Sequence, residues 1–286
     1  MGIRVPAPTE PLAAQAHFSA RDLGLPEHTV FRCFQALPSG QMAIGADYGL
    51  ALVSGEKVNA FPFPKGARKE SMDVQSLAFD GHSLHVVTTK NAYAWDLKQS
   101  VRAKPFPRDN DGGFEELRVV AMGPNGLIEA WREHWVCDGQ SHPGEDILSI
   151  ASNSEVAYYG TRGGQLGIFS GPILHRFIDD GHACPIRHLA WAHQRLWIAA
   201  AGAIYTYQGE QLTKVRDGEP FGFCVDPQGR LWSLDPQGVS LSNDTGELRR
   251  LQLKIERPWS IGADAQGLWI GQRGGISRWS WAPTPS

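Results

Sequence analysis

A pattern of about twelve residues occurs seven times along the 286-residue chain, and this repetition limits the folds that the chain can adopt. The last copy reads Leu268-Trp-Ile-Gly-Gln-Arg-Gly-Gly-Ile-Ser-Arg-Trp279. The six related copies begin at Met42, Leu84, Leu127, Ala157, Leu196 and Leu231. Successive copies start 30 to 43 residues apart, with a mean of about 38 residues. This spacing is typical of one four-stranded propeller blade.

Each copy contains the signals of a β-hairpin. An apolar triplet such as residues 196–198 is followed by a short Gly-containing turn and a second alternating run, residues 204–207. Another apolar run precedes each triplet, and a more polar run follows the hairpin. We therefore predict an all-β chain that forms a seven-bladed β-propeller of four-stranded antiparallel blades. The short interval before the fourth copy leaves six or eight blades as alternatives.

The two ends of the chain suggest how such a ring closes. The seventh copy ends at Trp281 after its third strand, whereas residues 1–29 belong to no copy. We predict a single domain at 1–286, in which residues 1–29 are a closing segment, 30–281 hold the seven repeats and 282–286 are a tail. The closing segment should supply the outer strand of the last blade, because an open ring would leave unpaired sheet edges. Within it, residues 9–20 could instead form one short turn of helix.

The phrases Gly267-Leu-Trp-Ile-Gly-Gln-Arg-Gly-Gly-Ile-Ser-Arg278 and Arg195-Leu-Trp-Ile resemble the two-component-regulator propeller repeat. In that family each blade carries a Gly-Leu-Trp-Ile-Gly-Thr signature, then Gly-Gly-Leu and an aromatic residue. The resemblance covers residues 30–281 as a repeat architecture and implies a propeller fold rather than a chemistry. Members of that family adjoin a membrane helix and a kinase. Since neither is expected in this chain, the sensor role does not carry over.

Composition excludes several classes of partner. The net charge is −3, so no basic excess is available to bind nucleic acid or acidic lipid. No run approaches 18 apolar residues, and the N-terminus lacks the apolar stretch of a secretory signal, so we expect a cytoplasmic protein. Four cysteines stand 40 or more residues apart, which favours buried free thiols over a metal or redox motif: Cys33, Cys137, Cys184 and Cys224.

A binding site is expected on one face of the disc. Strands of a blade alternate in direction, so the turns between second and third strands share a face with the inter-blade loops, at the channel mouth. The candidate binding residues on this face are Asp47, Tyr48, Lys90, Trp131, Arg132, His134, Arg162, His182, Trp259 and Arg273. Arginine recurs at one turn position in three blades, where it either binds anions or is a solvated turn residue. Trp131 occupies a position that holds smaller residues elsewhere, which predicts an exposed interface anchor.

No catalytic motif occurs in the sequence, so the catalytic residues are unknown, and we expect no cofactor and no bound metal. We predict a monomeric, non-catalytic scaffold that binds a partner protein through the loop face. One alternative is a lyase or hydrolase with its site at the channel mouth, in which His134, His142, His182, Asp179 and Glu219 could provide a base and metal ligands. The other is a small-ligand or carbohydrate site on Trp131.

Overall fold

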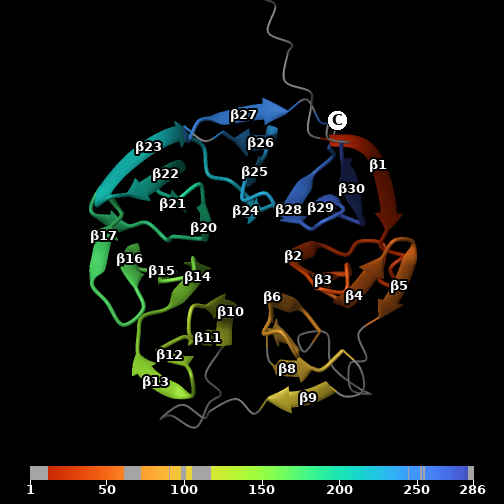
Figure 1. Ribbon diagram of the computed structural model, residues 1–286, viewed down its shortest axis with the longest axis horizontal. Helices are drawn as coiled ribbons and strands as arrows, with labels where there is room; N and C mark the ends of the chain where they lie inside the picture. The colour runs from red at the N-terminus through yellow and green to blue at the C-terminus, as the bar shows by residue number, and fades with distance from the viewer. Residues whose placement is uncertain are drawn as a thin grey trace, which may run out of the picture.

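The computed structural model describes residues 12–60, 72–89, 91–97, 101–104, 117–243, 245–251, 253 and 255–282. All regular elements within these ranges are β-strands. None of the described residues belongs to a helix that could cross a membrane. Figure 1 shows the strands as seven sheets set radially around a common centre. Each sheet contains four antiparallel strands, which confirms the seven-bladed β-propeller.

The first four blades follow the order of the chain. Blade 1 contains β2 (Phe31–Ala36), β3 (Met42–Ala46), β4 (Gly49–Ser54) and β5 (Lys57–Ala60). Blade 2 contains β6 (Val74–Phe79), β7 (Leu84–Thr88), β8 (Ala92–Trp95) and β9 (Val101–Lys104). Blade 3 contains β10 (Leu117–Gly123), β11 (Gly126–Trp131), β12 (His134–Cys137) and β13 (Gln140–Pro143). Blade 4 contains β14 (Ile147–Ser152), β15 (Ala157–Thr161), β16 (Gln165–Ile168) and β17 (Ile173–Arg176).

The remaining blades complete the ring. A small hairpin precedes blade 5 and contains β18 (Ile178–Asp179) and β19 (His182–Ala183). Blade 5 contains β20 (His188–Ala192), β21 (Arg195–Ala200), β22 (Ala203–Gln208) and β23 (Gln211–Asp217). Blade 6 contains β24 (Gly222–Val225), β25 (Leu231–Asp235), β26 (Gly238–Ser242) and β27 (Leu248–Leu251). Blade 7 contains β28 (Pro258–Ala263), β29 (Gly267–Gln272), β30 (Gly275–Trp281) and β1 (Leu12–Ser19). In every blade the first-named strand lies innermost (Figure 1).

Strand β1 closes the ring, as predicted. It pairs antiparallel with β30, so that Ser19 lies opposite Gly275 and Phe18 opposite Ile276. Phe18 also stacks on Trp269 of β29, with ring centroids 6.1 Å apart. The helical alternative for residues 9–20 is wrong. In residues 14–19, apolar and polar residues alternate with a period of two, and the free edge of β30 provides the hydrogen-bonding partner that such a strand needs.

Alternation along each second strand divides its side chains between the two neighbouring blades. In β21, Leu196 and Ile198 pack toward blade 4, whereas Trp197 packs against Leu231 of blade 6. In blades 5, 6 and 7, the second residue of the repeated pattern is a tryptophan that is almost completely buried: Trp197, Trp232 and Trp269. Burying a side chain of this size supplies much of the packing energy between blades.

Small residues bring the innermost strands of neighbouring blades close together. At the junction of blades 7 and 1, Gly271 lies opposite Ser260 in register, and the Ser260 hydroxyl donates a 2.6 Å hydrogen bond to the Phe31 carbonyl. Blade 4 repeats this arrangement, since Gly160 lies opposite Ser149, whose hydroxyl donates to the Ile186 carbonyl at 2.9 Å. A side chain at either glycine would occupy the space of the serine and of the next blade. Glycine is therefore needed here for close approach.

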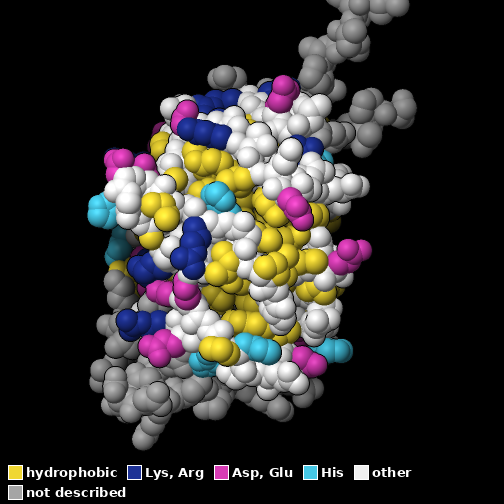
Figure 2. All heavy atoms as spheres, turned by 90° about the vertical axis from the view of Figure 1, so that its left-hand side faces the viewer, with side chains coloured by type: hydrophobic (Ala, Val, Ile, Leu, Met, Phe, Trp, Pro, Cys, Tyr) yellow, Lys and Arg dark blue, Asp and Glu magenta, His cyan; other side chains and the backbone are white. Residues whose placement is uncertain are grey.

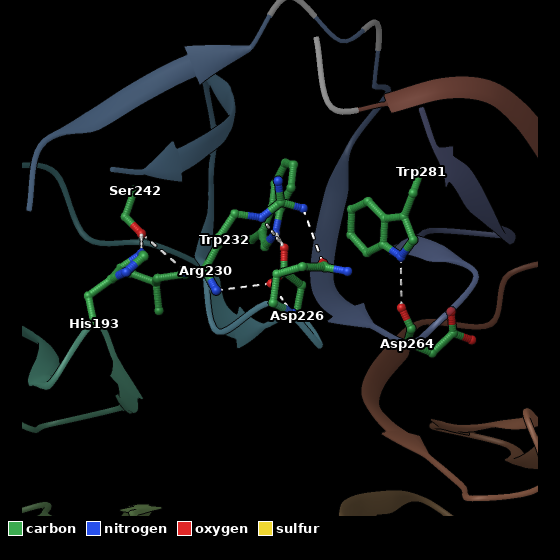
Figure 3. A network of polar contacts seen from close by, with 9 residues as sticks. His193, Asp226, Arg230, Trp232, Ser242, Asp264 and Trp281 are labelled. Atoms are coloured by element: carbon green, nitrogen blue, oxygen red, sulfur yellow. Dashed lines mark hydrogen bonds and ion pairs between the residues drawn. The ribbon is translucent and has the colours of Figure 1, made fainter. Parts of the chain in front are cut away.

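A polar network connects blades 5, 6 and 7 at the turns between their first and second strands, on the face of the disc away from the loop face (Figure 3). Asp226, which is buried, accepts hydrogen bonds from Arg230 Nε at 2.7 Å and from Trp232 Nε1 at 2.8 Å. The Arg230 guanidinium lies over the ring of Trp281 in blade 7, 5.6 Å from its centroid. His193 of blade 5 lies 3.0 Å from the Ser242 hydroxyl of blade 6. These contacts fix the turns of three adjacent blades relative to one another.

We expect deletion of residues 1–20 to lower the free energy of unfolding by about 2–5 kcal/mol, because the deletion removes the outer strand of blade 7 and exposes buried side chains. Urea unfolding measures the loss. A synthetic peptide spanning residues 9–24 should restore stability when added to the shortened chain. An unchanged urea midpoint after the deletion would show that β1 does not hold the ring closed.

Gly271→Ala should lower the free energy of unfolding by about 1–3 kcal/mol, because the added Cβ would overlap the Ser260 hydroxyl and lie 2.8 Å from Phe31 Cβ. Gly222→Ala is the matched control, since its Cβ would meet only Ile261, at an ordinary 3.5 Å. The measurement is the difference between the two variants in thermal midpoint. Equal midpoints would contradict the proposed role of close approach between blades.

Candidate binding site at the channel mouth

Five of the seven innermost strands carry a β-bulge near their first residue, at the loop face of the disc. In β2, Phe31 and Cys33 pair with consecutive residues of β3, so Arg32 between them is left out of the ladder. The same register shift occurs in β6, β10, β14 and β28. The extra residues there are Gln75, Arg118, Leu148 and Trp259. A bulge redirects a side chain that would otherwise follow the alternation of the strand.

A cavity of about 580 Å³ opens among these bulges at the channel mouth. Its walls come from blades 1, 2, 4, 5 and 7 and from the loops before blades 5 and 6. The lining residues are Arg32, Gln75, Leu148, Arg187, His188, Glu219, Pro220, Phe221 and Trp259. A volume of this size is within the range of ordinary ligand pockets.

Two exposed aromatic side chains form the apolar part of this cavity. Trp259 at the bulge of β28 is 51 % exposed, and Phe221 before β24 is 37 % exposed. Their rings are nearly parallel, with an interplanar angle of 13° and centroids 6.3 Å apart. Contiguous exposed apolar groups often mark binding sites, and aromatic residues, Trp in particular, are enriched in protein interfaces.

On the blade 1 and blade 2 side, Arg32 is held in place by hydrogen bonds. Its Nε donates to Asp73 Oδ1 at 3.0 Å, and the Thr89 hydroxyl donates to the other carboxylate oxygen at 2.9 Å. Gln75 donates to the Asp73 carbonyl at 3.4 Å and to the Thr89 hydroxyl at 3.3 Å. The inter-blade residue Asp73 therefore positions the Arg32 guanidinium before any ligand arrives.

The opposite wall carries a looser charge pair. Arg187 Nε lies 3.5 Å from Glu219 Oε1, and their side chains are 59 % and 38 % exposed. The next residue, His188, is half-buried, and burial lowers the pKa of its imidazole to about 4, with a smaller contribution from the Arg187 charge. His188 is therefore neutral near pH 7. The cavity presents two guanidinium groups, one carboxylate and one neutral imidazole.

Of the ten candidate binding residues, only Trp259 lines this cavity, together with Glu219, which the sequence suggested for the enzyme alternative. The prediction that Trp131 is an exposed anchor is wrong, because its side chain is 5 % exposed. Trp131 is the last residue of β11, on the side that faces blade 2, where the small side chains of Ala78 and Ala92 leave room for its ring. His134 stacks on it with an interplanar angle of 4°. A sugar platform on Trp131 is therefore not available.

Three other predicted residues surround the segment that closes the ring. Val30 pairs with Arg273 of blade 7, and its backbone exchanges hydrogen bonds with Asp47 of blade 1, donating to the Asp47 side chain at 3.0 Å. Tyr48 lies beside His28, with the hydroxyl 3.1 Å from its Nε2. Asp47 and Tyr48 thus help to attach the closing segment, whereas the Arg273 side chain is exposed.

The remaining candidates are spread over the loop face. Arg132 and Arg162 follow the second strands of blades 3 and 4, and both side chains are exposed. Arg162 forms a 2.6 Å ion pair with Asp146. His182 is exposed in the β18–β19 hairpin, and Lys90 lies outside the described residues. The common turn position of the three arginines is confirmed, but a shared binding site for them stays a prediction.

The proposed metal ligands do not form one group, although Asp179 and His182 lie opposite each other in the hairpin of β18 and β19. His142 stacks on Trp135 at a centroid distance of 4.1 Å, whereas His182 belongs to the hairpin before blade 5. Among the residues that the structure describes, no three His, Cys, Asp or Glu side chains form a group that could hold a metal ion. The four cysteines are free and only partly buried, and burial raises the pKa of Cys33 to about 12.

Sequence reasoning missed the bulge residues Arg32, Gln75 and Leu148. A signal was available, because three of the bulges are followed by a serine that is buried: Ser76, Ser149 and Ser260. Three inner strands therefore begin with the same pattern of an apolar residue, a variable residue and a serine. The variable residue of this pattern is the one whose side chain lies at the channel mouth.

Comparison with known proteins supports the fold and leaves the chemistry open. No protein-family model and no curated protein matches the sequence. The structure is similar to the extracellular domain of the BT4673 one-component system from B. thetaiotaomicron, with a TM-score of 0.71 and 19 % identity over 91 % of this chain. The chain spans only 39 % of that domain.

Two further structures match along their whole length. Virginiamycin B lyase from Staphylococcus aureus has a TM-score of 0.71 at 13 % identity, covering 93 % of this chain and 99 % of the lyase. YCF48, in a structure with bound D1 peptide, has a TM-score of 0.66 at 12 % identity, covering 98 % of both chains. At such identities the similarity establishes the propeller fold alone.

The free energy of unfolding should fall as the pH drops from about 6.5 to about 4, because the unfolded chain protonates His188 over this range and the folded protein does not. The contribution of this one group is of the order of 3 kcal/mol, at about 1.4 kcal/mol per pKa unit. His188→Gln should make the fall shallower, as measured by urea unfolding at several pH values. Parallel curves for the two proteins would refute a depressed pKa.

Proposed function

We propose that this protein is a binding module that captures a segment of a partner protein at the channel mouth. The observation that carries the proposal is the exposed, nearly parallel pair of Phe221 and Trp259 within a cavity lined by charged groups. Trp259 is fixed by a bulge in a strand that packs against both neighbouring blades. The aromatic surface is therefore largely formed before binding, which reduces the entropic cost of association.

A second apolar area competes with the channel mouth as a docking surface. Figure 2 shows apolar side chains along the rim of the disc on the side of blades 3 to 5. Ile173 of β17 is 46 % exposed and Ile178 of β18 is 62 % exposed. Neither residue lines the cavity at the channel mouth, which combines aromatic rings with positioned guanidinium groups. Specific recognition needs such polar groups in addition to apolar area, so we favour the mouth.

The structural neighbours are consistent with this proposal. YCF48, which shares the fold, is known in a structure with a bound peptide. This supports a protein or peptide as the class of partner that we propose, in agreement with the expectation from the sequence. Virginiamycin B lyase shows that the same fold also occurs in an enzyme. The described residues of this chain provide an aromatic and charged surface for binding, and the imidazole of His188, with its pKa near 4, is a weak base.

We expect the double variant Phe221→Ser/Trp259→Ser to lose partner binding by at least about tenfold while it stays folded, because both rings are already exposed in the free protein. The measurement is affinity capture from native lysate with quantitative mass spectrometry, accompanied by the thermal midpoint of each variant.

Two controls locate the binding surface in the same experiment. Ile178→Ser removes an exposed apolar side chain from the rim and should leave capture unchanged. The triple variant Arg132→Ala/Arg162→Ala/Arg273→Ala tests the turn arginines. Capture that survives the double variant but is lost with Ile178→Ser or with the triple variant would reject the channel mouth as the site.

A further inference from the structure

The composition of the channel mouth indicates which chemistry it recognises. Resting on the proposed function, we infer that it selects a segment in which a carboxylate group lies next to an aromatic or large aliphatic side chain. The inference depends on three properties of the cavity: its apolar wall, its guanidinium groups and its size.

The apolar wall accounts for the hydrophobic half of the ligand. Phe221 and Trp259 present nearly parallel rings, and Leu148 and Pro220 line the same cavity. A planar or branched apolar side chain placed against these groups would displace water from both rings. Aromatic groups gain additional energy from offset stacking or edge contacts at the ring spacing seen here.

The guanidinium groups of the lining favour an anionic group beside that side chain. Arg32 is paired with the Asp73 carboxylate at 3.0 Å and Arg187 with Glu219 at 3.5 Å, so the preference depends on the unused donors of the two guanidinium groups and not on an excess of positive charge. Arg32 is oriented through its Nε by Asp73, and its other guanidinium nitrogens can form charge-assisted hydrogen bonds. The 3.5 Å separation between Arg187 and Glu219 exceeds hydrogen-bonding distance, so a ligand carboxylate can compete with Glu219 for this arginine.

The neutral state of His188 contributes to the same selection. A protonated imidazole would add a third positive charge and make the cavity bind any anion strongly. With the ring uncharged near pH 7, the positive charge is confined to two guanidinium groups, whose planar donors match a carboxylate. A Lys or Arg side chain of a ligand would instead meet Arg32 and Arg187, which disfavours basic segments.

The volume of about 580 Å³ suits a short segment of a ligand. It accommodates one large side chain and its neighbour rather than a folded domain. The carboxylate can come from an aspartate or glutamate side chain or from the end of a chain. These two sources share their chemistry and can be separated by experiment.

The test uses the intact protein and four short peptides, with binding measured by calorimetry. One contains Phe-Glu between blocked ends, one ends in Phe with a free carboxylate, and the other two replace Phe-Glu by Phe-Gln and Phe-Lys. At least one carboxylate peptide should bind about tenfold more tightly than the Gln peptide, and the Lys peptide should bind most weakly. The tighter of the two carboxylate peptides identifies the source of the charge.

Variants of the protein separate the charge preference from binding itself. Arg187→Gln and Arg32→Gln should each reduce the preference for the Glu peptide over the Gln peptide to less than about threefold. Trp259→Ala should weaken the binding of all four peptides. Raising the salt from about 50 to about 500 mM should reduce the preference, since exposed charges are screened. Because Arg187 is exposed and loosely paired, its variant tests the charge effect without disturbing the fold.

The outcomes distinguish this inference from the proposed function. If the Glu, Gln and Lys peptides bind equally tightly and Trp259→Ala loses this binding, the carboxylate preference is overturned and the proposed peptide-binding function stands. Binding that is insensitive to Trp259→Ala, or absent for every peptide, would overturn both the preference and the peptide site at the mouth. Tighter binding of the Lys peptide would also overturn the preference.

Discussion

The close approach of neighbouring inner strands is the interaction on which the rest of the structure depends. At the junctions after blades 4 and 7, a glycine in the second strand lies opposite a serine, whose hydroxyl donates a hydrogen bond to a backbone carbonyl of the next blade. Blade 1 has the same glycine, Gly45, opposite Cys33. A buried hydroxyl that satisfies a buried carbonyl offsets the cost of removing both from water. The tryptophans of the second strands can then pack against the neighbouring blades, as Trp197 packs against Leu231.

This contact also explains why a binding site forms where it does. The serine in the inner strand must face the next blade, and the bulge immediately before it shifts the register of the strand. The extra residue is thereby free of the ladder and lies beside the central channel. The positions that vary between blades, such as Arg32 and Trp259, thus stand next to a position that holds a serine in three of the five bulged strands. Rigid support of variable side chains is a common design of binding surfaces.

The sequence predicted the repeat, the blade count and the closing strand, because these depend on apolar periodicity and on the need to pair sheet edges. It did not predict the site well. Trp131 looked like a turn residue, but one position along a strand decides whether a side chain faces solvent or a neighbouring blade. Arg32, Gln75 and Leu148 lie in segments that look like ordinary strands, and a bulge depends on pairing with a distant strand. Phe221 stands in an apolar run and was not among the candidate residues, although it is 37 % exposed.

The pairing of β1 with β30 has a consequence for how the protein is made. His17 and Ser277, which lie opposite each other in this pair, are separated by 260 residues. A ribosome adding about 5–20 residues per second needs roughly 10–50 s to synthesise the intervening chain. Throughout this interval β1 has no partner, and six blades can form only as an open arc with two unpaired edges. The nascent chain therefore passes through a long period in which protection by a chaperone would be most useful, and the ring closes as one of the last events of folding.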